Sequence, residues 1–323
     1  MDSNVWYDRF LEALYAKYPK RAKLTEALMD LLFIEREAVY RRLRKDVTFS
    51  IHEVVKISSA WNISLDEISG TSSGDIPFLM KTINYLEPSE HDMKFLRHVI
   101  RSVSDHNDFP DTEVMNVCNK LPRKLYSGFK YLNLFYLFKW KYNFGSEKKA
   151  VPFSQITSSV SEEWLQLSAD YFQALKNVPH TIFIFDPMIF NYMVDEIRYF
   201  HSIRLITDEE KEFIRKDLHD LLHYLSDITA HAAHLETQNK VSIYISHLPI
   251  NTNYSYTSAS WANVCFIHAF EKYDVYSYHP KMVENFKMWM QLKKRKCIQI
   301  SGVDEKSRVE FFSEQHQIVD MLF

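Results

Sequence analysis

The chain has 323 residues, 46% of them hydrophobic and 15% aromatic, which is enough apolar material for a small domain and one large or two modest further domains. Its 39 basic and 42 acidic residues give a net charge of −3, which argues against a non-specific polyanion binder. The most apolar runs are too short or too polar to span a bilayer and no signal-peptide pattern is found, so we expect a cytoplasmic protein that makes no membrane contact.

The N-terminal part of the sequence predicts a series of short helices. Apolar residues recur at helical spacing over residues 5–18 and again over residues 25–32. After a short break at Phe33 and Ile34, the spacing resumes over residues 35–44. Two Ser-x-x-Glu capping boxes, Ser50 with Glu53 and Ser64 with Glu67, predict that further helices begin near residues 51 and 65.

The helix predicted over residues 35–44 is rich in arginine on the side that cannot face a core. Val39 and Leu43 form its apolar stripe, and the polar residues fall roughly opposite them. Between residues 17 and 45 nine basic residues stand against four acidic ones, whereas over residues 1–70 both kinds number eleven. Any attraction to phosphate must therefore come from a local arrangement of charge.

The order of these elements resembles a known family. The third helix and its ending read KISSAWNISLDEI over residues 56–68, after a helix, a tight turn and a short second helix. In this order the first 70 residues resemble the Xre/Cro phage-repressor class of helix-turn-helix domains. Phe33 stands where that class usually has glycine. The resemblance implies a DNA-binding domain over residues 1–70 whose second reader helix suits the major groove of duplex DNA.

Two sets of residues are expected to contact the DNA. Base edges would be read from the basic helix by Arg36, Glu37, Tyr40, Arg41 and Arg44. Phosphates would be contacted by Lys20, Lys23, Arg42 and Lys45. The alternative for the same helix is a solvated surface of a protein-interaction module, with its arginines paired to Glu35 or Glu37.

A polar segment separates this domain from the rest of the chain. Residues 71–75 form the predicted linker. Two of the five glycines of the chain lie here, Gly70 just before the linker and Gly74 within it. Residues 76–236 are predicted to be mainly helical, with helices over 90–104, 111–119, 123–142, 161–176, 188–201 and 208–236. A capping box at Thr207 and Glu210 marks the start of the last of these.

From residue 240 the pattern changes to alternation. Strands are predicted over 241–246, 254–258, 262–268, 273–277 and 297–301, and helices over 279–293 and 304–322. The predicted fold class is thus a mainly α N-terminal helix-turn-helix domain followed by a larger α+β region with a small mixed sheet. Residues 237–323 form its α/β section, which can belong with residues 76–236 to one regulatory or dimerisation domain.

No motif for a cofactor is found, and the candidates for chemistry are weak. His219, His223 and Asp227 share helical spacing suited to a metal, but they lack an HExxH arrangement. A turn over residues 301–304 before a helix could hold an anion, with Arg308 one turn further on. The aromatic residues between 129 and 144 favour a buried helix or a protein interface. The three cysteines are far apart in the sequence and indicate neither a CxxC metal site nor a disulfide framework.

The sequence therefore predicts a transcriptional regulator that is not an enzyme, binds double-stranded DNA and forms a homodimer through the region after residue 75. A small-molecule effector is predicted to enter the α/β section, beside the rings of Tyr244, Tyr254, Tyr256, Trp261 and Tyr276. Two alternatives remain: an enzyme with its catalytic domain in residues 76–323 tethered by the N-terminal module, or a protein-interaction adaptor.

Overall fold

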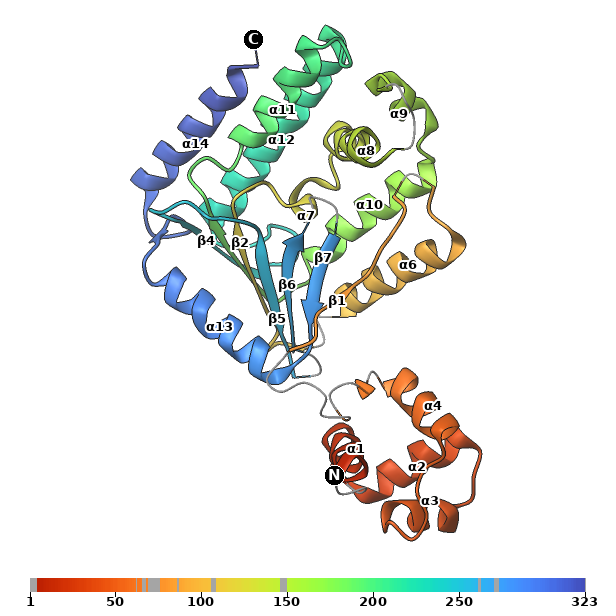
Figure 1. Cartoon of the computed structure of the whole chain (residues 1–323). Helices are drawn as coiled ribbons and strands as arrows, with labels where there is room; N and C mark the ends of the chain where they lie inside the picture. Colours follow the sequence, from red (N-terminus) through yellow and green to blue (C-terminus); the bar gives the residue numbers. More distant parts are fainter. Residues whose placement is uncertain are drawn as a thin grey trace. The chain divides into compact units, whose positions relative to one another are not determined.

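The computed structural model describes residues 5–61, 63–65, 68, 76–85, 87–105, 109–145, 150–260, 263–269 and 273–322. The chain divides into two compact units, Met1–Ile76 and Pro77–Phe323, shown in Figure 1. The first is helical and the second combines helices with a mixed sheet. Among the described residues, no helix is both long and apolar enough to cross a membrane.

The N-terminal unit contains the short helices that the sequence predicts. They are α1 (Val5–Lys17), α2 (Arg21–Leu32), α3 (Arg36–Leu43) and α4 (Ile51–Trp61). One apolar core holds them together, and it includes Phe10, Leu28, Val39 and Ile57, each fully buried. The capping box at Ser50 and Glu53 is confirmed, whereas Glu67 of the second predicted box lies outside the described residues.

The C-terminal unit is built on an eight-stranded mixed sheet with the order β1-β7-β6-β5-β2-β3-β4-β8. Its strands are β1 (Leu79–Met80), β2 (Glu113–Cys118), β3 (His180–Phe185), β4 (Lys240–Ile245), β5 (Tyr254–Ser258), β6 (Asn263–Ala269), β7 (Tyr273–Ser277) and β8 (Ile298–Gln299). The central strands β2, β3 and β4 run parallel, and every other pairing is antiparallel. A parallel half and an antiparallel half therefore meet at β2.

Helices cover both faces of this sheet. They are α6 (Glu90–Ser104), α7 (Arg123–Tyr126), α8 (Lys130–Phe144), α9 (Phe153–Ser159), α10 (Glu162–Leu175), α11 (Asn191–Ser202), α12 (Asp208–His231), α13 (Pro280–Lys294) and α14 (Glu305–Asp320). Figure 1 shows α13 on one face and the larger group, including α8, α11, α12 and α14, on the other. Successive side chains along a strand point to opposite faces of the sheet, so the buried side chains form two cores, one on each face.

Two sequence predictions for this unit are wrong. The segment 111–119 was expected to be a helix but forms β2, and the apolar segment that forms β3 was not predicted as a strand. Both are central strands covered on both faces, so they lack the alternation of a half-buried strand. The helix expected over 123–142 is divided into α7 and α8 around Gly128. The remaining predicted helices and strands are confirmed, with ends that differ by a few residues.

The consequence is a larger sheet than the sequence predicts. Strands β2 and β3 come from the section expected to be mainly helical, yet they pair with β4 and β5 from the α/β section. The two sections therefore share one sheet within one compact unit.

Candidate functional site

The turn between α2 and α3 is tight, and Phe33 adopts the left-handed conformation (φ 56°, ψ 44°) that usually favours glycine. Its N–H donates to the carbonyl oxygen of Met29 at 2.8 Å. The side chain is 86% exposed, so no core contact opposes this geometry. The turn is thus short although it lacks a glycine.

Helix α3 presents a charged side to solvent. Val39 and Leu43 are buried in the core of the unit, while Arg36, Arg41 and Arg44 are exposed. Arg44 makes ion pairs with Glu37 at 2.8 Å and with Asp46 at 3.2 Å. Within the described part of the chain, no ion pair involves Arg36 or Arg41, and the same holds for the exposed Lys20 and Lys23.

Three of the predicted DNA contacts are instead engaged inside the N-terminal unit. Arg42 forms a two-pronged ion pair with Glu53, with Nε–Oε2 at 3.1 Å and Nη2–Oε1 at 2.8 Å. Lys45 is paired with Asp8, and the guanidinium carbon of Arg21 lies 5.5 Å from the centre of the half-buried Tyr40 ring. These contacts hold α3 against the rest of the unit.

The Glu53 carboxylate has a further role at the start of α4. It accepts a hydrogen bond from the backbone N–H of Ser50 at 2.8 Å as well as those from Arg42. Burial acts to raise the pKa of Glu53, but these hydrogen bonds outweigh it and the pKa lies below its usual value. Arg42 is therefore a structural residue that positions α3 relative to α4.

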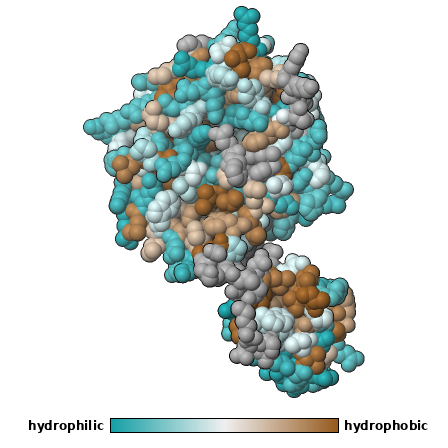
Figure 2. Space-filling model, in the orientation of Figure 1, coloured by the Kyte–Doolittle hydropathy of each residue, from teal (hydrophilic) through white to brown (hydrophobic). Residues whose placement is uncertain are grey.

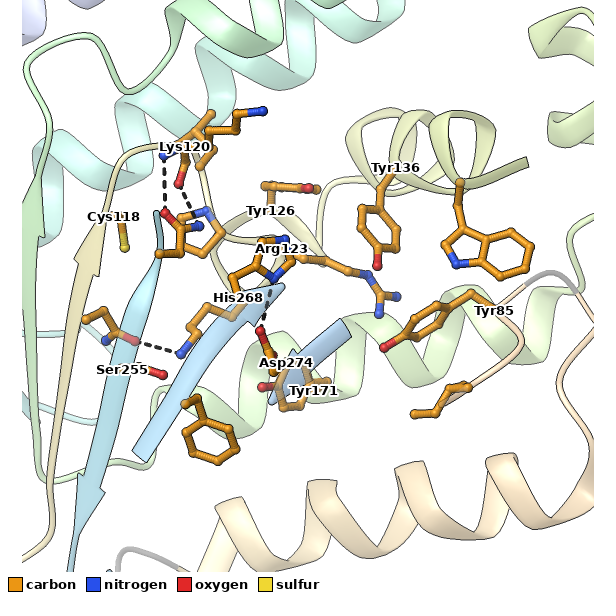
Figure 3. A pocket seen from close by; sticks show the side chains of 18 of the residues that line it. Tyr85, Cys118, Lys120, Arg123, Tyr126, Tyr136, Tyr171, Ser255, His268 and Asp274 are labelled. Carbon is orange, nitrogen blue, oxygen red and sulfur yellow. Dashed lines mark hydrogen bonds and ion pairs between the residues drawn. The ribbon is translucent and has the colours of Figure 1, made fainter. Parts of the chain in front are cut away.

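A second candidate site is a cavity of about 600 Å³ inside the C-terminal unit, drawn in Figure 3. Its floor is the antiparallel half of the sheet, where one row of paired residues runs across four strands: Asn116, Ser255, Phe266 and Tyr276. Its walls come from α6, α7, α8, α10 and α11. It lies at the carboxyl end of β2, beyond which α7 follows directly, and ligands of open α/β sheets bind at such an edge.

Arg123 occupies the centre of this cavity. Figure 3 shows its side chain reaching between Tyr136 and Tyr85, and its guanidinium carbon lies 4.8 and 5.0 Å from the centres of these rings. The Trp164 ring lies 5.5 Å away. Such short contacts with ring faces are attractive for a cation.

The polar contacts of Arg123 are all to neutral groups. Nε and Nη2 donate to Asn133 Oδ1 at 3.4 and 3.2 Å, and Nη2 also donates to Ser168 Oγ at 3.2 Å. No carboxylate among the described residues pairs with this guanidinium. Aromatic rings and neutral oxygens thus surround its positive charge. Nη1 has no hydrogen-bond acceptor in the part of the chain that the structure describes.

Lys124 is the second cation of the cavity. Its Nζ donates to Asn116 Oδ1 at 2.6 Å, and Asn116 is fixed in turn because its Nδ2 donates to the carbonyl oxygen of Ile182. Burial lowers the pKa of the Lys124 ammonium, since removal from water disfavours the charged form. No carboxylate within the described ranges pairs with Lys124 either.

The remaining titratable groups of the cavity differ in setting. His268 and Asp274, opposite each other on β6 and β7, are joined by a 3.0 Å contact between Nδ1 and Oδ1 and keep substantial exposure. Burial raises the pKa of the Cys118 thiol to about 12, so this cysteine stays protonated at neutral pH. Cys118 is therefore not a thiolate nucleophile.

Only part of the predicted effector site coincides with this cavity. Tyr276 lines it, but Tyr256 and Tyr244 lie on the opposite face of the sheet, where their hydroxyls meet Glu113 and Gln299. Tyr254 also lines the cavity, and its ring contacts Phe286 and Trp289 of α13. Trp261 lies outside the described residues. Most of the cavity is built from residues before position 240, outside the section in which the sequence predicts an effector site.

The key residues Asn116, Arg123 and Lys124 were missed because β2 was expected to be a helix. Once β2 is a strand, the adjacent basic pair Arg123-Lys124 begins five residues after its last residue, Cys118. A basic pair just past a parallel strand is the signal that could have pointed to this site.

The other sequence candidates form no site. His219 is engaged with His316 (Nδ1–Nδ1 3.0 Å) and Asp320 (3.2 Å), and within the described ranges no group of three or more potential ligands could hold a metal ion. At the turn over residues 301–304, the Asp304 carboxylate accepts from the backbone N–H of Ser307 at 2.9 Å, so the chain's own side chain occupies the place of an anion. The burial predicted for the aromatic helix α8 is confirmed in part, because Phe135 and Phe138 are buried whereas Tyr142 and Phe144 at its end are exposed.

Comparison with known proteins identifies no relative. No protein-family model matches the sequence, and neither a curated protein nor a solved structure matches it significantly.

Proposed function

We propose that the protein is a sequence-specific DNA-binding regulator of transcription and that α3 of its N-terminal unit enters the major groove. The observation that carries this proposal is the division of α3 into two sides. Val39 and Leu43 anchor the helix in the core, while Arg36 and Arg41 are exposed and have no ion pair among the described residues. Arginine donors in this setting suit the paired acceptors O6 and N7 of guanine.

Within this proposal, the predicted DNA contacts have different roles. Arg44 is exposed, and its pairs with Glu37 and Asp46 are surface ion pairs, which cost little to exchange for DNA contacts. Arg42 is engaged with Glu53 and we assign it a positioning role instead of a phosphate contact. Lys20 and Lys23, at the start of α2, remain the proposed phosphate contacts.

The proposal includes a dimer. A single short reader helix offers little contact area, and readers of this kind commonly bind paired half-sites about 34 Å apart. The C-terminal unit would hold the two copies together, and sedimentation of the full chain at tens of micromolar tests this part separately.

A second candidate function is an adaptor that binds another protein. Figure 2 shows hydrophobic residues on the surface of the N-terminal unit, and Phe33 and Ile51 are 86% and 78% exposed. An interface of that kind would be apolar and insensitive to salt. A DNA interface that neutralises several phosphates would instead weaken steeply as salt rises.

The test is selection from random duplex DNA with the full chain, followed by affinity measurement on the enriched sequence at several salt concentrations. We expect one enriched sequence and an affinity that falls steeply between about 50 and 200 mM salt. Retention of no sequence above the starting pool would contradict the proposal, and binding of protein partners by the same material would favour the adaptor.

A further inference from the structure

We propose that the cavity of the C-terminal unit is a binding site for a small organic anion with an aromatic body, whose acidic group is held by Arg123 and Lys124. The site is separate from the proposed DNA contact, and its test requires no DNA. Three observations carry it: two cations that lack a carboxylate partner among the described residues, hydrogen-bond donors without acceptors there, and a cavity of suitable size that is partly lined by aromatic rings.

The first observation is an imbalance of charge. Arg123 and Lys124 are adjacent on α7, both line the cavity, and neither meets a carboxylate in the described residues. Lys139, at the wall, is already paired with Glu196. Asp274 pairs with His268, and its charge acts on Lys124 without forming an ion pair with it among the described residues. Two partly buried cations whose hydrogen-bond partners are all neutral are costly, and an incoming anion would lower that cost.

The second observation is an excess of hydrogen-bond donors. Nη1 of Arg123 carries two N–H groups, and the Lys124 ammonium has two N–H groups beyond the one given to Asn116. Nε1 of Trp164, a side chain only 2% exposed, also has no acceptor among the described residues. The ligand is expected to supply acceptors, and ionised oxygens make the strongest bonds to such donors.

The third observation is the enclosure. About 600 Å³ is within the usual size of sites for organic ligands and far exceeds the volume of an inorganic anion. Several aromatic side chains line the cavity, Phe95 of α6 and Phe266 of β6 among them, beside polar groups such as Asn143 and Ser255. Ring edges and faces of this kind favour a flat aromatic body.

The cation positions are fixed before any ligand arrives. Arg123 is held by Asn133 of α8 and Ser168 of α10, and Lys124 is held by Asn116 of β2. Fixed donors lose little conformational freedom on binding, which favours affinity. The site is thus preorganised by three separate elements around α7.

The experiment compares two fluorescent probes with the same aromatic body. 8-Anilinonaphthalene-1-sulfonate carries an acidic group, and N-phenyl-1-naphthylamine lacks it. With the full chain we expect saturable binding of the sulfonate at one site per chain, at least about ten-fold tighter than the neutral probe. Inorganic sulfate, which lacks the body, should displace the sulfonate probe only weakly.

Variants locate the site. Lys124→Met and Arg123→Gln should each weaken the sulfonate probe about ten- to hundred-fold and change the neutral probe less than about three-fold. The matched controls are Lys296→Met and Arg295→Gln, two exposed residues just beyond α13. If Arg123→Gln does not fold, Lys124→Met still tests the proposal, because it removes the charge of Lys124 and keeps the length of the side chain. Equal loss of both probes, or sulfonate binding unchanged in Lys124→Met, would overturn the proposal.

Discussion

The two units of the molecule use arginine in opposite ways. In the N-terminal unit, Arg36 and Arg41 are exposed on α3, where solvent and salt screen them. In the C-terminal unit, Arg123 is enclosed by three aromatic rings and neutral oxygens. An exposed cation can meet the backbone of a large polyanion, whereas an enclosed one can meet only a molecule that fits its cavity.

A second contrast lies within α3 itself. Arg41 and Arg42 are adjacent in the sequence, yet Arg41 is exposed and the side chain of Arg42 is only 18% exposed beside Glu53. Residue type and position along the chain therefore do not decide the role of an arginine. What decides it is whether the side chain can reach a carboxylate, and substitutions of the paired and the exposed arginines can test this.

The largest effect is expected from a partly buried charge of the C-terminal unit. The Glu113 carboxylate is bonded to His180 and Tyr256, and the interaction with His180 is the main cause that lowers its pKa to about 2 from 4.5. The folded protein therefore gains stability above pH 4.5 and loses it as pH falls toward about 2. Because the carboxylate is partly exposed, Glu113→Gln should cost no more than about 3 kcal/mol.

Thermal unfolding of wild type and Glu113→Gln across this pH range checks the prediction. The difference between their melting temperatures should shrink as the wild-type carboxylate is protonated. A difference that stays constant from neutral pH down to about pH 2 would show that the charge of Glu113 is not what stabilises the fold.

Arg42→Ala should destabilise the N-terminal unit by about 2 kcal/mol, because it leaves Glu53 without its main partner. The effect is smaller than for a fully buried pair, since the two side chains are 18% and 14% exposed. Arg36→Ala, on the exposed side of the same helix, should change stability by less than about 0.5 kcal/mol. Amide hydrogen exchange of α4 in the full chain measures both, and equal protection in the two variants would remove the distinction between them.

Gly128→Ala should lower stability by about 1 to 3 kcal/mol through overpacking. A Cβ at this position would lie 2.6 Å from Cδ1 of the buried Phe172 ring, which is itself in contact with Phe129 and Tyr224. The control is Gly145→Ala, where φ is −67° and alanine fits without strain. Melting temperatures that fall equally in both variants would rule out the steric cause.

The smallest effect should come from the phosphate contacts. Lys20→Ala and Lys23→Ala should each weaken binding of every duplex alike, by about 1 kcal/mol at low salt, and reduce the slope of log affinity against log salt by about one. A change confined to one DNA sequence would instead assign these lysines to base recognition. Filter binding to the selected duplex and to a scrambled one distinguishes the two results.

The sequence predicts local structure well where the periodicity is that of an exposed or half-buried element. Helices α1 to α4 and strands β5 and β7 follow directly from apolar spacing and caps. It fails at β2 and β3, because a strand buried on both faces has no alternation to distinguish it from a helix.

The same limit explains what could be predicted of the sites. The exposed arginines of α3 can be predicted from the local apolar spacing of that helix. The pairing of Arg42 with Glu53, however, depends on how α3 lies against α4. The cavity brings Arg123 together with Trp164 and Phe266, which come from three distant segments. Contacts between distant segments are fixed by the sheet order, which local periodicity does not contain.

The central claim is that α3 reads DNA, and the affinity of Arg41→Ala for the selected duplex tests it most directly. Arg41 is exposed and has no ion pair within the described residues, so its removal should leave the fold unchanged. Fluorescence anisotropy should show a loss of about 1 to 3 kcal/mol on the selected duplex and a much smaller loss on a scrambled one. Arg295→Ala, an exposed arginine of the other unit, should bind like wild type. Equal affinity of Arg41→Ala and wild type on the selected duplex would contradict the claim.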